Sequence, residues 1–108
     1  MLTVKIHTGE DGCLLSLAGH AGAGKKGSDI VCAAASILAY TGAASVRQLY
    51  RAGKLSKAPV IRLHPGDARI EIFDGGQAGE QLFDTLQTGF ALLAAKYPNH
   101  VKLEAIER

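Results

Sequence analysis

Residues 19–36 read GHAGAGKKGSDIVCAAAS, and within this stretch the predicted structure changes from strand to helix. Four glycines fall among the first nine of these residues, which leaves little side chain to pack and much backbone freedom. This composition predicts a flexible loop over residues 19–27. Ser28 and Asp29 follow, and their side-chain oxygens can accept hydrogen bonds from the unpaired N–H groups of a first helical turn. Because an alanine-rich run comes next, we predict a helix from about Asp29 to Arg51, which Gly53 ends.

Short apolar runs on either side of this helix predict strands that pair as hairpins. Leu2, Val4 and Ile6 alternate with polar residues, and a turn at residues 9–12 separates them from an apolar run at Cys13–Ala18. A Pro-Gly pair within residues 64–67 favours a second tight reversal. The predicted elements after the first helix are strands at Val60–Leu63 and Ala68–Phe73, a helix at about Ala78–Tyr97, and a strand at Val101–Ile106.

These elements predict an α+β fold of order ββαββαβ. Two amphipathic helices are expected to pack on one face of a mostly antiparallel five-stranded sheet. The length of 108 residues predicts a single domain over residues 1–108. We expect the first helix to turn one apolar stripe toward the core, formed by Ile30, Ala34, Ile37, Leu38, Ala44 and Leu49.

Composition and charge exclude several classes of protein. Hydrophobic residues make up 47% of the chain, which is too apolar for an intrinsically disordered protein. Lys and Arg number 12 against 10 Asp and Glu, a smaller basic excess than a dedicated nucleic-acid binder carries. No signal or transit peptide is visible, and no stretch reaches the ~18 uninterrupted apolar residues of a membrane span. Because the only cysteines are Cys13 and Cys32, we expect a reducing compartment and a cytoplasmic protein.

Two phosphate-binding motifs match the glycine-rich loop incompletely. Residues 22–27 fit G-x-G-x-x-G, but a dinucleotide-binding fold needs a parallel strand soon after the helix, and here a hairpin is predicted. Residues 19–25 fit G-x-x-x-x-G-K, but Lys26 stands where a hydroxyl must hold magnesium. A helix N-terminus beside two lysines could still hold an anion. We expect no nucleotide cofactor.

His20 and Cys32 form a stronger candidate pair. Unpaired N–H groups and the positive end of the helix dipole stabilise a thiolate at a helix start, which is where Cys32 is predicted to lie. The loop can fold back to bring the His20 imidazole within hydrogen-bond reach, giving the nucleophile and general base of acyl transfer. The alternative is structural, since a cysteine in an alanine-rich helix is often a small buried hydrophobe and a histidine beside glycine is often solvated.

The other cysteine and histidines predict packing or solvation. Cys13 falls in an apolar strand, whereas His7, His64 and His100 fall at a strand end, a turn and a strand start. The spacing among the cysteines and histidines lacks the short pairs that organise a zinc site, so we expect no metal.

The segments Gly19-His20-Ala21 and Gly27-Ser28-Asp29-Ile30-Val31-Cys32 resemble the ribosomal-processing cysteine protease family, called Prp. The predicted element order and the length also agree with this family. The resemblance implies an endopeptidase that removes a short hydrophobic N-terminal extension from the twenty-seventh protein of the large ribosomal subunit during ribosome assembly. It implies Cys32 as nucleophile, His20 as general base and acid, and a homodimer. Asp29 and Ser36 match further recurrent positions of the family's pattern.

The positions of Asp29 and Ser36 relative to the helix indicate which roles each can have. We expect Asp29 to cap the helix rather than to orient His20. Ser36 lies one helical turn after Cys32, where it could hydrogen-bond near the thiol or the substrate backbone. We further expect the free enzyme to hold His20 too far from Cys32, with substrate ordering the loop, because of the freedom conferred by Gly22, Gly24 and Gly27.

A second class of function is a non-enzymatic RNA- or ribosome-binding module. An RNA-binding protein would show a salt dependence that weakens with each lysine removed, whereas a protease would lose cleavage on Cys32→Ala. A protease would not require direct contact with nucleic acid. The basic residues that motivate the alternative cluster around one helix and are Lys25, Lys26, Arg47, Arg51, Lys54 and Lys57.

Overall fold

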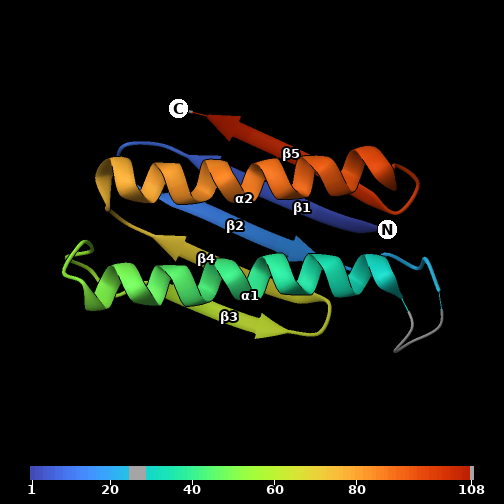
Figure 1. The fold of residues 1–108 in the computed structure, drawn as a ribbon, viewed down its shortest axis with the longest axis horizontal. Coiled ribbons are helices and arrows are strands. Elements are labelled where there is room, and N and C mark those ends of the chain that lie inside the picture. Colours follow the sequence, from blue (N-terminus) through green and yellow to red (C-terminus); the bar gives the residue numbers. More distant parts are fainter. Residues whose placement is uncertain (25–28, 108) are drawn as a thin grey trace.

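The computed structural model describes residues 1–24 and 29–107, and it confirms the predicted α+β order of elements. Two helices lie across one face of a five-stranded sheet and run in opposite directions (Figure 1). The predicted boundaries differ from the observed ones by two residues or fewer. The elements are β1 (Leu2–Thr8), β2 (Cys13–Ala18), α1 (Ile30–Arg51), β3 (Val60–His64), β4 (Asp67–Ile72), α2 (Gly76–Lys96) and β5 (Val101–Glu107).

The sheet is mixed, with the strand order β3-β4-β2-β1-β5. Both hairpins and the β2–β4 pair are antiparallel, whereas β5 pairs in parallel with β1 and places Val101 opposite Leu2. α2 connects β4 to β5 and crosses over β2 and β1, so that β5 reaches the free edge of β1 (Figure 1). The backbone N–H of Leu2 therefore donates to the carbonyl of His100, at 2.9 Å.

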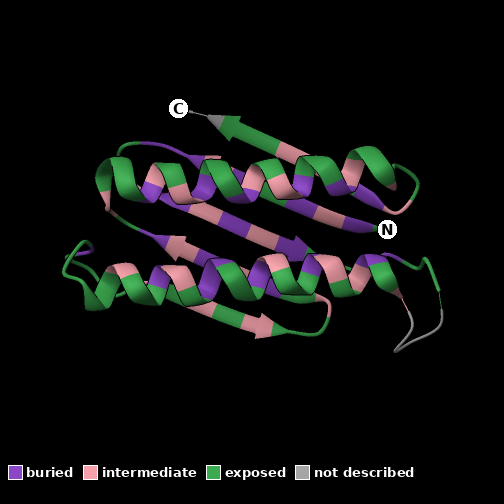
Figure 2. Ribbon diagram, in the orientation of Figure 1, coloured by how far each residue is buried: buried purple, intermediate pink, exposed green. Residues whose placement is uncertain are grey.

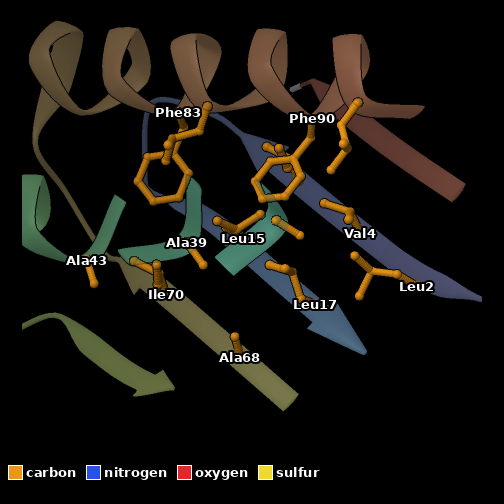
Figure 3. Close-up of a cluster of buried hydrophobic side chains, with 14 of the residues drawn as sticks. Leu2, Val4, Leu15, Leu17, Ala39, Ala43, Ala68, Ile70, Phe83 and Phe90 are labelled. Atoms are coloured by element: carbon orange, nitrogen blue, oxygen red, sulfur yellow. The ribbon is translucent and has the colours of Figure 1, made fainter. Parts of the chain in front are cut away.

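The core lies between the sheet and the helices. Val4 in β1, Leu15 in β2 and Ile70 in β4 are 0% exposed, because alternate residues of a strand point to the same face. Phe83 and Phe90 of α2 point down into this layer and are also fully buried (Figure 3). Complete burial of each such side chain contributes about 1.5–3 kcal/mol relative to exposure. This layer fixes α1 and α2 against the sheet.

Half of the residues that were predicted to form the buried apolar stripe of α1 are exposed, so the prediction is wrong at these positions. Ile30 and Ile37 are 65% and 62% exposed, and Ala44 is exposed as well. Ala34, Leu38 and Leu49 are partly buried and pack against the core. The face that is buried is rotated around the helix and is made mostly of small side chains (Figure 2), namely Val31, Ala35, Ala39, Gly42, Ala43 and Val46.

Close packing between the two helices explains this rotation. A Cβ atom on Gly42 would lie 2.9 Å from Cδ1 of Leu86 in α2, so no larger side chain fits there without displacing Leu86.

By length and composition alone α1 could cross a membrane, although the sequence contains no long uninterrupted apolar run. In the described structure, however, its buried face packs on the sheet and on α2, as the core helix of a folded domain does.

Candidate active site

Four segments meet at the end of the molecule where α1 begins. They are the loop after β2, the first turn of α1, the β3–β4 turn and the α2–β5 turn (Figure 1). The N–H of Gly19 donates to the carbonyl of Gly66 in the β3–β4 turn, at 3.0 Å. This contact ties the loop that carries His20 to the β3–β4 turn, and the bond from Leu2 to His100 ties the α2–β5 turn to β1.

Asp29 caps α1, as the sequence predicts. Its Oδ1 accepts the backbone N–H groups of Val31 and Cys32, each at 3.0 Å, and its Oδ2 accepts the N–H of Ala23 at 3.0 Å. The pKa of the Asp29 carboxyl is lowered, chiefly because the backbone N–H of Cys32 donates to it, and the other donors include the Cys32 thiol. Among the described residues Asp29 makes no hydrogen bond with His20.

Cys32 presents a partly exposed thiol on the first turn of α1. The backbone N–H of Ala21 donates to Cys32 Sγ at 3.4 Å across the mouth of the loop. The sulfur thus lies on the first turn of a helix and within reach of a backbone donor from the facing loop. The environment of Cys32 therefore suits a nucleophile.

Cys13 is the contrasting thiol. It is 3% exposed in β2, as the sequence predicts for a packing residue, and its Sγ lies 3.9 Å from the carbonyl oxygen of Gly9. Burial raises the pKa of the Cys13 thiol, so this group stays protonated inside the core. The two thiols thus differ, since Cys32 is partly exposed and Cys13 is buried.

His20 lies beside the β3–β4 turn. A Cβ atom on Gly66 would lie 2.8 Å from Nε2 of His20, so the imidazole rests directly on that glycine. Gly66 has a φ of +73°, which also favours glycine at this position. His20 is exposed, and within residues 1–24 and 29–107 it has no hydrogen bond to Cys32. The structure thus brings Asp29 and Cys32 together. The ring of His20, from the loop after β2, lies against the β3–β4 turn.

His100 is the residue at this end that sequence reasoning missed. It was expected to be solvated at a strand start, but it is half-buried and its Nδ1 lies 3.0 Å from the carbonyl oxygen of Ala21. The two residues are 79 positions apart, and no local pattern in the sequence connects them. The parallel pairing of β5 with β1 brings His100 to the site.

The remaining predicted positions are placed as follows. Ser36 is exposed on α1 one turn beyond Cys32, and Gly22, with a φ of +69°, and Gly24 are exposed in the loop. No group of three or more His, Cys, Asp or Glu side chains in the described part of the chain is placed to hold a metal. The predicted positions that lie outside the described residues are Lys25, Lys26, Gly27 and Ser28.

Known structures share this fold. The ribosomal processing protease Prp from S. aureus, in complex with a covalently linked product peptide, aligns with a TM-score of 0.77 at 24% identity, over 97% of this chain and 99% of that chain. The same protease with a substrate peptide aligns with a TM-score of 0.72 at the same identity and coverage. SMU.848 from Streptococcus mutans aligns with a TM-score of 0.68 at 23% identity, over 100% of this chain and 96% of that chain.

The comparison with family models shows which family the chain belongs to, in addition to its fold. No curated protein matches the chain. The model of the family described as cysteine protease Prp matches residues 1–102, which is nearly the whole length. The chain therefore belongs to the cysteine protease Prp family.

Proposed function

We propose that this protein is a processing endopeptidase in which Cys32 is the nucleophile and His20 the general base and acid. The observation that carries the proposal is the partly exposed Cys32 thiol on the first turn of α1, with the Ala21 N–H directed at its sulfur. Membership of a cysteine protease family supports the reaction class. Cys13 is unsuited to the same role because it is buried in the core.

In the proposed reaction His20 takes the proton from Cys32 Sγ, and the sulfur attacks the scissile carbonyl carbon. The negative charge that develops on the carbonyl oxygen needs hydrogen-bond donors other than the N–H groups of Val31 and Cys32, which already donate to Asp29. The C–N bond then breaks, and His20 returns the proton to the leaving amine. Water, deprotonated by His20, hydrolyses the thioester and regenerates the thiol.

This mechanism requires the His20 ring to leave Gly66. The imidazole lies against Gly66, and no hydrogen bond joins it to Cys32 among the described residues, so we propose that the side chain rotates toward the sulfur when substrate binds. Such a rearrangement on substrate binding would complete the catalytic pair only in the presence of a peptide.

We propose as substrate the precursor of a large-subunit ribosomal protein, the twenty-seventh of its series, with a short hydrophobic N-terminal extension. The S. aureus neighbours, described as a ribosomal processing protease with product and substrate peptides, support a peptide of this origin. The proposal also includes a cytoplasmic location and a homodimer. Among the described residues both helices lie on one face of the sheet and none of the elements covers the other, so a second copy could pack there (Figure 1).

A cleavage assay tests the catalytic proposal. A peptide that spans the junction between extension and mature protein is incubated with the enzyme, and products are located by mass spectrometry. Wild type and Cys13→Ala should cut at the junction, whereas Cys32→Ala should not and His20→Ala should be slower by about 10²–10⁴-fold. Cleavage that survives Cys32→Ala would refute the assignment.

The proposed homodimer is tested by light scattering, which gives the mass of the protein in solution and so distinguishes a dimer from a monomer.

The RNA-binding alternative gains less support from the structure. Arg47, Arg51, Lys54 and Lys57 are exposed, but they lie toward the far end of α1. Arg47 follows Cys32 by 15 positions, which corresponds to about 22 Å along a helix. A basic surface there is separate from the thiol site. RNA affinity that is unchanged by Cys32→Ala and falls with salt would favour this alternative.

A further inference from the structure

The backbone of Ala21 is held at two points, its N–H and its carbonyl oxygen. Its N–H donates to Cys32 Sγ at 3.4 Å, and its carbonyl oxygen lies 3.0 Å from Nδ1 of His100. The Ala21 side chain is 2% exposed, which fixes the residue against the core. The backbone of one residue, Ala21, therefore links the imidazole of His100 to the sulfur of Cys32 through two consecutive peptide units.

The orientation of this peptide is not set by the loop itself. Gly22 directly follows Ala21 and Gly19 precedes it by two residues, and both glycines have positive φ angles, of +69° and +91°. A short backbone segment between two such glycines has more rotational freedom than one between ordinary residues. A contact from outside the loop is thus needed to hold the Ala21 N–H toward Cys32.

His100 is anchored well enough to provide that contact. Its carbonyl accepts the N–H of Leu2 at 2.9 Å, and its own N–H donates to the carbonyl of Tyr97 at 3.0 Å. These bonds hold the α2–β5 turn to the first residue of β1. Because a carbonyl oxygen can only accept, the ring nitrogen facing Ala21 carries the proton, and His100 donates through Nδ1–H.

We propose that His100 is a positioning residue for the thiol. By hydrogen-bonding the Ala21 carbonyl, it aims the Ala21 N–H at Cys32 Sγ and so stabilises the thiolate that begins the reaction. The proposal rests on the function assigned above to Cys32. It gives His100 no contact with substrate.

The experiment compares His100→Asn with His100→Leu. The amide nitrogen of asparagine can occupy the place of Nδ1 and still donate, whereas leucine fills similar space without a donor. Cys32 alkylation by iodoacetamide is followed by peptide mapping, with buried Cys13 as the internal control. Exchange of the Ala21 amide hydrogen is measured in the same variants, and circular dichroism verifies that each is folded.

We expect His100→Leu to slow Cys32 alkylation about tenfold, because a hydrogen bond to a charged group is worth about one decade or more. Ala21 amide exchange should accelerate, and kcat should fall with little change in KM. His100→Asn should restore most of all three quantities. A folded His100→Leu variant with wild-type alkylation and exchange would overturn the proposal, as would equal losses in the two variants.

These results are distinguishable from a failure of the proposed function. If the wild-type enzyme does not cut the junction peptide, or Cys32→Ala still cuts it, the protease assignment fails. Alkylation of Cys32 and exchange at Ala21 need no substrate, so they test the link from His100 to Cys32 in either case.

Discussion

Asp29 and Cys32 are joined at the start of α1 by a hydrogen bond of 3.0 Å from the N–H of Cys32 to Oδ1 of Asp29. The second oxygen of the same carboxylate, Oδ2, accepts the N–H of Ala23 in the preceding loop, also at 3.0 Å. One side chain thus fixes both the helical turn that presents the thiol and the loop that faces it. Changes at Asp29 should therefore affect stability and activity to different extents.

Replacing Asp29 separates its two contacts. Asp29→Ala should lower both the melting temperature and peptide cleavage, because the first helical turn loses its cap. Asp29→Asn keeps an oxygen for the cap but places an amide against the Ala23 N–H, so cleavage should fall more than the melting temperature does. Asp84→Ala on the exposed surface of α2 is the matched control and should leave both unchanged. Equal effects of Ala and Asn would contradict this division of roles.

Acid should destabilise the protein through Asp29 and Asp74. The pKa of Asp74 is lowered by hydrogen bonds from the hydroxyl and then the backbone N–H of Ser56, and that of Asp29 chiefly by the N–H of Cys32. A carboxyl whose folded pKa is lowered stabilises the fold above its ordinary pKa of 3.8, and this contribution is lost as the pH falls through the folded pKa.

Urea unfolding at a series of pH values measures this effect. The free energy of unfolding should be level above the ordinary carboxyl range and fall below it. In the double variant with Asp29→Asn and Asp74→Asn, the acid-dependent part should be shallower, because these groups no longer release a proton on folding. An acid limb as steep as that of the wild type would assign the effect to other carboxylates.

Enlarging Gly42 should disrupt the contact between the helices. Gly42→Val should lower the free energy of unfolding by about 1–3 kcal/mol, since its Cβ alone would lie 2.9 Å from Leu86 Cδ1. Ala44→Val adds the same side chain at an exposed position two residues later and should change stability far less. Chemical denaturation compares the two variants. A Gly42→Val protein as stable as Ala44→Val would show that Leu86 moves aside freely.

The two thiols should differ in reactivity only while the protein is folded. In native buffer an alkylating reagent should modify Cys32 much faster than Cys13, because Cys13 is buried and its pKa is raised by that burial. In concentrated urea the two rates should converge. Mass spectrometry of the labelled peptides gives both rates in one sample. Rapid native labelling of Cys13 would indicate local opening of β2.

The strands, the helices and the cap of α1 could be predicted from the sequence because each depends on neighbouring residues. Period-two and period-3.6 apolar patterns mark the strands and helices, and Asp29 precedes the N–H groups that it caps. The pair His20 and Cys32 could also be proposed from spacing and family resemblance. These two residues could be proposed because the motif that contains them spans a short stretch of the sequence.

The face of α1 that is buried could not be predicted in the same way. Ile30 and Ile37 are the larger apolar residues, yet the helix buries Gly42 and its small neighbours because α2 packs closely there. Hydrophobicity along a sequence ranks side chains one at a time, whereas a packed interface selects those whose shapes fit together.

Tertiary structure alone decided what surrounds the thiol. The ring of His20 rests on Gly66 because the β3–β4 turn lies beside the loop after β2. His100 reaches Ala21 because α2 crosses the sheet and β5 then pairs with the edge of β1. Both contacts join segments that are distant along the chain. Such contacts depend on strand order, which the local pattern of apolar residues leaves open.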